Sequence, residues 1–197
     1  MRSSAEPAHP AFTTCRLQAH PQTPCSSVEV IVELGIAAGD VLVVRYAIVG
    51  DLDRLRIPAA GARLDPDRLW EHTCCELFVA PSPNERYEEW NFSPSGQIAR
   101  FEFSAYRRRI PAASPIHTAP LEVTGQDRAL RLAARVPLPA HRGEPVSLSL
   151  TAVVEDATGT RSYWALRHPA DHPDFHDRRG FAVSVTSGPP IAIDQRG

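Results

Sequence analysis

The chain has 197 residues, 43% of them hydrophobic, and a formal net charge of −2, which fits one globular domain with its own core. This charge balance offers no basic field for a phosphate backbone, so we expect no nucleic-acid partner. All 21 basic residues are arginine, which excludes Schiff-base and P-loop lysines.

The expected location is cytoplasmic. The four cysteines have no CxxC spacing, and the N-terminal residues lack the apolar run of a signal peptide. No stretch approaches the roughly 20 consecutive apolar residues that a membrane-spanning helix needs, so no membrane partner is expected.

Strand patterns follow one another along the chain. The β-branched runs 28–35 and 41–50 flank the turn AAGD, which is typical of a hairpin, and SPSG at 93–96 predicts a second turn. Helical turns are expected only near Pro66 and, in RGEP, near Glu144. The further strand runs are CCELFVAPSPN, RYEEWNFSPSGQ, IARFEFSAY, LEVTGQD, ALRLAARVPL, SLSLTAVVEDATG, SYWALR and FAVSV. The pattern predicts an all-β sandwich over residues 12–186, with flexible tails at 1–11 and 187–197.

The segment ALRHPADHPDFHDRRGF, residues 165–181, concentrates histidine and aspartate. His168, His172 and His176 recur every four residues, but Pro169 and Pro173 exclude a helix that would align them. As a loop, the segment offers nitrogen and oxygen ligands for zinc or non-haem iron. Its composition also suits a turn anchored by side-chain-to-backbone hydrogen bonds, which we prefer.

Two strand segments carry polar residues that suggest a binding surface. Glu76 shares a strand face with Cys74 and needs solvent or a partner, for which Arg100 or Arg107 are candidates. In 86–107 one face collects polar residues, which suits a polar ligand with Trp70 or Trp164 as a stacking platform. These polar residues are Tyr87, Glu89, Asn91 and Ser93. The alternatives are a structural ion pair for Glu76 and core positions for the tryptophans.

Five motifs in order, LRIP, LWEHTCCELFVA, YEEWNFSPSGQIARFEFSAYR, SYWALRHP and HPDFHDRRGF, resemble the bacterial DOMON-like family, which is related to family 9 carbohydrate-binding modules. The resemblance covers about Phe12 to Val185 and implies an antiparallel β-sandwich of roughly ten strands that recognises a ligand, since related domains bind sugars or haem. The chain departs from the pattern where HTCC replaces the paired aspartate that sugar-binding relatives favour. Without lysine or internal methionine, only a bis-histidine haem site would remain.

The expected function is therefore a soluble, non-enzymatic module that binds a sugar or a sugar-derived small polar ligand. In this hypothesis Trp164 stacks on the ligand, Glu76 and Asn91 bind its hydroxyl groups, and histidines complete the wall. The candidate site residues are Trp70, His72, Glu76, Asn91, Trp164, His168, Asp174 and His176.

The alternatives place the same histidines in other chemistry. One is a metal-dependent enzyme in which zinc or iron is held by His168, His172 and His176, or by two of them with His72 and an aspartate, and Asp174 or Glu76 is the general base. A weaker alternative is a bis-histidine haem protein. The sequence has no GxSxG, HExxH or GxxxxGKS motif, and no catalytic residue is assigned.

Overall fold

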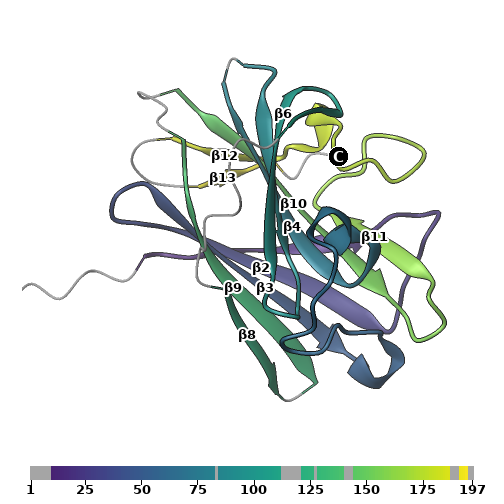
Figure 1. Ribbon diagram of the computed structural model, residues 1–197. Coiled ribbons are helices and arrows are strands. Elements are labelled where there is room, and N and C mark those ends of the chain that lie inside the picture. The colour runs from purple at the N-terminus through teal and green to yellow at the C-terminus, as the bar shows by residue number, and fades with distance from the viewer. Residues whose placement is uncertain are drawn as a thin grey trace, which may run out of the picture.

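A computed structural model describes residues 10–82, 84–111, 121–126, 128–139, 144–186 and 191–194 (Figure 1). Within them the regular structure is almost entirely strand. The strands are β1 (Thr13–Ala19), β2 (Val28–Ala37), β3 (Val41–Gly50), β4 (Cys74–Pro81), β5 (Tyr87–Phe92), β6 (Ile98–Ala105), β7 (Arg108–Ile110), β8 (Leu121–Gln126), β9 (Ala129–Pro137), β10 (Val146–Glu155), β11 (Arg161–Ala165), β12 (Val183–Val185) and β13 (Ala192–Ile193). Three short 3-10 helices are η1 (Leu52–Arg54), η2 (Pro66–Glu71) and η3 (Arg178–Gly180).

The strands form an antiparallel β-sandwich, as expected. The first sheet has the order β1-β2-β3-β9-β8, and the second has the order β7-β6-β5-β4-β10-β11, with β12 beside β10 and β13 beside β12. Strand β1 belongs to both sheets, because residues 13–17 pair with β2 whereas Gln18 and Ala19 pair with β11. The described strands number thirteen, and the short strands β7, β12 and β13 account for the excess over ten.

The core lies between the two sheets and follows from strand alternation. In β2, Val28, Val30 and Val32 are buried, whereas Glu29 points outward. Strand β4 is buried on both faces, with Cys75, Leu77 and Val79 in the core between the sheets. Its opposite face, with Cys74, Phe78 and Ala80, belongs to a second apolar cluster. We call this opposite side of the second sheet its outer face.

The second cluster exists because two segments cover the outer face. Helix η2 contributes Leu69, and the segment 166–182 contributes Phe175 and Phe181. Helix η2 confirms the helical turn expected near Pro66, and the Asp65 side chain caps it by accepting a hydrogen bond from the Asp67 amide. The RGEP segment lies partly outside the described residues.

Part of the expected C-terminal tail belongs to the sheet instead. Strand β13 pairs with β12, and the Asp194 amide donates a 2.8 Å hydrogen bond to the Ala182 carbonyl. Residues 191–194 are therefore fixed by backbone pairing rather than forming a free tail. The rest of that segment and residues 1–9 of the expected N-terminal tail lie outside the described residues. No helix in the described part of the chain is long and apolar enough to cross a membrane.

Candidate ligand-binding pocket

A pocket of about 510 Å³ opens on the outer face of the second sheet. Its floor comes from β4, β5, β6 and β10, and its walls come from η2, the β6–β7 turn and the segment 166–182. Three expected site residues, Trp70, Glu76 and His176, line it. Its aromatic side chains are Trp70, Phe78, Phe101, Phe103, Tyr163 and Phe175.

Strand register brings two glutamates to the pocket floor. Strand β4 places Glu76 on the outer face, and β5 places Glu89 and Asn91 on that face. Glu76 lies opposite Asn91 in the ladder, and Phe78 lies opposite Glu89, so the two glutamates are diagonal neighbours. Both are buried, at 3% and 5% exposure.

The two carboxyl groups have different partners. Glu76 Oε2 lies 3.5 Å from the Thr151 hydroxyl, whereas Glu76 Oε1 has no hydrogen-bond partner. Burial raises the pKa of Glu76 well above its ordinary range, and the nearby charge of Glu89 raises it further. Burial also raises the pKa of Glu89, but a 2.7 Å hydrogen bond from the Asn91 amide opposes this shift. The pair therefore retains protons at higher pH than exposed glutamates do.

His176 forms the wall beside Glu89. Its Nε2 atom lies 3.7 Å from Glu89 Oε2, and its Nδ1 atom lies 2.8 Å from the Tyr87 hydroxyl. Burial, followed by the charge of Arg107, lowers the pKa of His176 to about 4. The imidazole is consequently neutral at pH 7.

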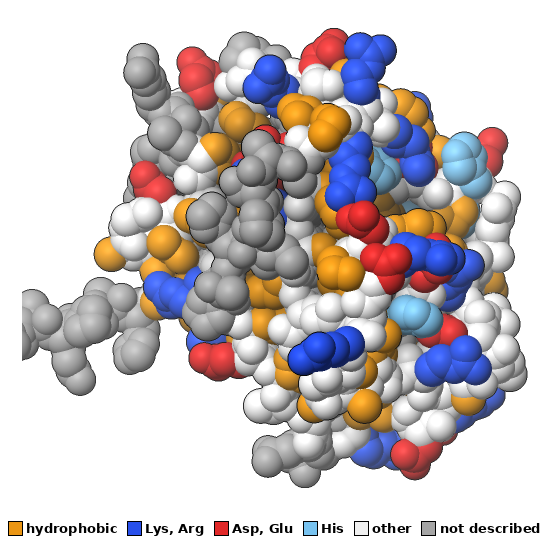
Figure 2. All heavy atoms as spheres, in the orientation of Figure 1, with side chains coloured by type: hydrophobic (Ala, Val, Ile, Leu, Met, Phe, Trp, Pro, Cys, Tyr) orange, Lys and Arg blue, Asp and Glu red, His pale blue; other side chains and the backbone are white. Residues whose placement is uncertain are grey.

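The charges at the pocket mouth are paired. Arg107 Nη2 lies 2.9 Å from Asp174 Oδ1, and Arg109 Nη2 lies 2.8 Å from Asp67 Oδ1. The Arg109 guanidinium also lies 4.0 Å from the centre of the Phe101 ring. Figure 2 shows this intermixing of arginine, acidic and hydrophobic side chains on the face of the molecule seen there.

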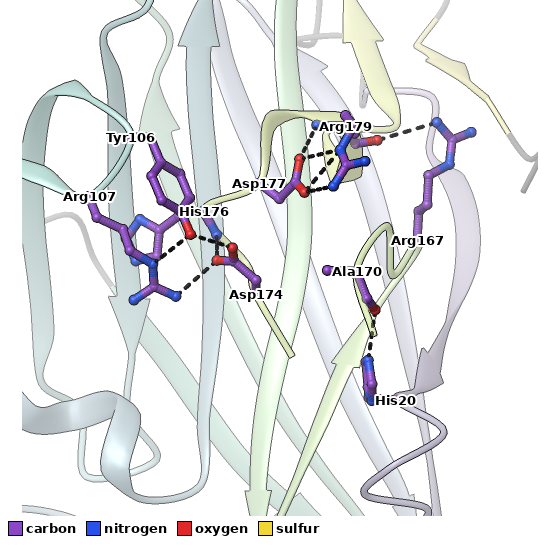
Figure 3. A network of polar contacts seen from close by, with 9 residues as sticks. All are labelled: His20, Tyr106, Arg107, Arg167, Ala170, Asp174, His176, Asp177 and Arg179. Carbon is purple, nitrogen blue, oxygen red and sulfur yellow. Dashed lines mark hydrogen bonds and ion pairs between the residues drawn. The ribbon is translucent and has the colours of Figure 1, made fainter. Parts of the chain in front are cut away.

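Two sets of contacts, at 168–170 and at Asp174, fasten the first half of the segment 166–182 to the sandwich, and Figure 3 shows those from His20, Tyr106 and Arg107. Near β1, the His168 ring contacts the Gln18 carbonyl at 2.8 Å and the His20 ring contacts the Ala170 carbonyl at 3.2 Å. At the β6–β7 turn, the Tyr106 hydroxyl donates a 2.7 Å hydrogen bond to Asp174, alongside the ion pair from Arg107. This geometry supports the anchoring role that we preferred for the segment.

The three histidines of this segment do not converge, so they do not form the metal loop that was the alternative to anchoring. His168 contacts β1, His176 lies in the pocket wall, and His172 is exposed. His72 does not join them either, because its Nδ1 atom lies 2.9 Å from Glu155. Among the residues that the structure describes, no group of three His, Cys, Asp or Glu side chains is placed to hold one metal ion. Proline-directed turns spread the imidazoles instead of stacking them.

The role expected of Trp164 is wrong. Its side chain is 4% exposed, lies in the core between the sheets, and donates a 2.9 Å hydrogen bond to Ser162. Tyr163, the adjacent residue, lines the pocket in its place. Trp70 is 40% exposed at the pocket rim and is available for stacking. Asn91 is fully buried and acts through its hydrogen bond to Glu89.

The structure corrects the arginine partners expected for Glu76. Neither arginine expected beside Glu76 pairs with it, because Arg100 binds Glu88 and Arg107 binds Asp174. Strand alternation predicted that Glu89 lies on a polar face of its strand. Its position beside Glu76 depends on the register between β4 and β5, which the sequence does not show. The remaining lining residues that were missed are Asp67, Phe78, Phe101, Phe103, Arg109, Val153, Pro173 and Phe175.

Another depression, of about 540 Å³, lies between the β1–β2, β3–β4 and β10–β11 connections. It contains no buried ionisable side chain among its lining residues, and its Asp156 carboxylate already accepts hydrogen bonds from Thr158 and Thr160. The outer-face pocket is therefore the better candidate site, since it combines exposed aromatic surface with an unsatisfied acceptor.

Comparison with known proteins identifies structural neighbours. No protein-family model matches the sequence, and none of the curated proteins matches it. A proposed carbohydrate-binding protein from Bacteroides uniformis is similar in structure, with a TM-score of 0.62 and 16% sequence identity over 87% of this chain and 84% of that chain. A family 9 carbohydrate-binding module from Caldicellulosiruptor kristjanssonii, solved with cellotriose, has a TM-score of 0.50 and 11% identity over 76% and 70% of the two chains. At these identities the likeness shows that the chain has the β-sandwich fold of carbohydrate-binding modules.

Proposed function

We propose that this protein is a carbohydrate-binding protein and that the outer-face pocket is its sugar site. One observation carries the proposal: the exposed indole of Trp70 lies at the rim of a pocket in which a buried acceptor, Glu76 Oε1, has no hydrogen-bond partner. A buried polar atom without a partner is costly, and a ligand hydroxyl group would satisfy it.

The chemistry of the lining matches that of a sugar. A pyranose ring presents an apolar face of C–H groups, which packs on an aromatic ring, and hydroxyl groups around its edge. Trp70 and Tyr163 offer aromatic surface, and Glu76 and Glu89 offer acceptors. The structural neighbours support the proposal, because one is described as a proposed carbohydrate-binding protein and another holds cellotriose.

The proposal also includes finer assignments. We place the protein with the DOMON-like relatives of carbohydrate-binding modules, on the motifs LWEHTC and NFSPSG, and assign it a binding rather than a catalytic role. A cytoplasmic location is part of the proposal, supported by four cysteines that are all free thiols.

Tryptophan fluorescence during titration with cellotriose tests the proposal. The chain has three tryptophans, and Trp90 and Trp164 are buried, so a ligand at the pocket should change chiefly the emission of Trp70. Trp70→Ala should weaken binding by about tenfold, the equivalent of one aromatic stacking contact. Trp70→Phe should retain most of the affinity measured by calorimetry.

The thermal midpoint of both variants serves as the folding control. Saturable binding of cellotriose or glucose that is lost in Trp70→Ala supports the proposal. Absence of binding by the wild type, or unchanged affinity in a folded Trp70→Ala variant, contradicts it.

A further inference from the structure

The pocket has an excess of acidic side chains over basic ones, and a neutral sugar has no positive charge that would interact with this excess. Each arginine in its lining is paired with an aspartate, Arg107 with Asp174 and Arg109 with Asp67. Among the described residues that line the pocket, Glu76 and Glu89 are the acids without an arginine partner. The excess charge of the site is therefore negative and belongs to this pair.

The surroundings of the pair favour a cation over water. Glu76 and Glu89 are both buried, at 3% and 5% exposure, so their carboxyl groups are poorly solvated when ionised. Aromatic rings from β4, β6, β11 and the segment 166–182 line the same pocket, and such rings attract ammonium groups through their π faces. The Arg109 guanidinium already makes this contact with Phe101.

We propose that the pocket prefers ligands that carry a primary ammonium group, which among carbohydrates means amino sugars. In the complex this ammonium group lies between Glu76 and Glu89. The inference rests on the proposed sugar-binding function and specifies the class of sugar. The ammonium group would donate to Glu76 Oε1, which has no partner, and to Glu89, forming charge-assisted hydrogen bonds.

Binding of a cation should also displace a proton. The pair retains a proton because burial and mutual repulsion oppose its second ionisation, and the positive charge of a bound ammonium group offsets both effects. The proton leaves from the carboxyl group to the buffer, while the ammonium group stays charged. The other ionisable side chains around the pair are Asp67, Cys74, Tyr87, Tyr163, Arg107, Arg109 and His176.

These neighbours leave the pair as the source of the proton. Burial keeps the thiol of Cys74 and the hydroxyl of Tyr87 protonated by raising the pKa of each. The depressed pKa of His176, about 4, leaves its ring neutral near pH 6.5. The two arginines stay charged throughout.

Calorimetry of the full chain with glucosamine, glucose and N-acetylglucosamine tests the inference. It is run at about pH 6.5, where an aliphatic ammonium group is charged, in two buffers that differ in ionisation enthalpy. Glucosamine should bind at least about tenfold more tightly than the two neutral sugars, the gain from one charge-assisted hydrogen bond. Its apparent binding enthalpy should depend on the buffer, whereas that of glucose should not.

Glu76→Gln keeps the shape of the side chain and removes its ability to ionise, so it should abolish the buffer dependence and reduce the preference for glucosamine, with Glu89 still present. The matched control is Glu102→Gln on β6, because that side chain is 49% exposed and lies outside the pocket. Equal affinities for glucosamine and glucose would overturn the inference and leave the sugar-binding proposal intact. Absence of binding by all three sugars would overturn both.

Discussion

The side-chain amide of Asn91 donates a 2.7 Å hydrogen bond to Glu89 Oε1, two residues earlier on β5. This bond stabilises the carboxylate form of Glu89 and opposes the rise of its pKa that burial causes. Glu76, opposite Asn91 in the ladder, has only a 3.5 Å contact with Thr151. The two glutamates therefore form a coupled pair in which the negative charge resides mainly on Glu89.

The first prediction concerns stability and pH. The folded-state pKa of Glu76 lies above its ordinary value of 4.5, so the folded protein binds more protons than the unfolded chain above that pH. The contribution of Glu76 to the free energy of unfolding should therefore fall as pH rises from 4.5 through its folded-state pKa. Glu76→Gln should reduce this loss, because the glutamine side chain does not titrate.

Urea unfolding of the wild type and Glu76→Gln between pH 4 and pH 8 measures the difference. Glu89 remains in the variant, so the loss of stability should be reduced rather than absent. Glu102→Gln should retain the wild-type profile because its side chain is half-exposed. An identical profile for Glu76→Gln and the wild type would show that the pocket does not shift this carboxyl group.

The second prediction concerns His176. Burial and Arg107 lower its pKa to about 4, so its ring should stay neutral until the pH falls close to that value. Because the unfolded chain binds the proton near its ordinary pKa of 6.5, stability contributed by this group is lost as pH falls from 6.5 through about 4. NMR titration of the ring nitrogens measures this, and the resonance missing from His176→Gln identifies it. Protonation near pH 6.5 would mean that the ring is solvated, contrary to its place against Tyr87 and Phe103.

Local sequence patterns predicted most of the fold. The hairpin of β2 and β3 has alternating apolar residues and a glycine-containing turn, both of which are local signals. Strand β13 has only two residues, and its partner β12 is separated from it by seven positions, so no local pattern marks it. Its pairing is a tertiary interaction, which explains why residues 191–194 were expected to be a tail.

The site was predicted in part, and strand parity explains the errors. Tyr163 and Trp164 are adjacent on β11 and must point to opposite faces, but the sequence does not tell which face is the core. The hypothesis chose Trp164 for the pocket, whereas Trp164 is in the core and Tyr163 lines the pocket. Glu76 was identified because a carboxylate in an apolar strand needs a partner or solvent, and Trp70 was one of the two tryptophans considered for stacking.

The third prediction concerns the pocket wall. Asp174 accepts hydrogen bonds from Tyr106 and from the His176 amide, in addition to its ion pair with Arg107. Asp174→Ala should destabilise the protein by about 1–3 kcal/mol, since the partners include charged and partly buried groups. It should also speed hydrogen exchange at the His176 amide and weaken cellotriose binding several-fold.

Asp177→Ala is the matched control, because Asp177 caps η3 in the same segment and accepts from the Arg179 amide without lining the pocket. It should cost about 1 kcal/mol through loss of a cap and leave the affinity unchanged. Equal weakening of cellotriose binding by both variants would contradict the prediction. It would mean that any loss of order in the segment 166–182 affects the pocket and that the contacts of Asp174 have no specific effect.

The fourth prediction separates the two tryptophans that the sequence could not distinguish. Trp164→Ala removes a side chain that is 4% exposed and leaves a cavity between the sheets, so it should cost about 3–5 kcal/mol in the free energy of unfolding. Trp70→Ala removes a side chain that is 40% exposed, and it should cost less than about 1 kcal/mol. Urea unfolding followed by far-UV circular dichroism measures both. Should Trp164→Ala fail to fold, Trp164→Phe provides the milder core change and should still be less stable than the wild type, with binding of cellotriose unaltered. The reverse ranking, with Trp70 critical for stability and Trp164 for binding, would mean that β11 presents its other face to the pocket.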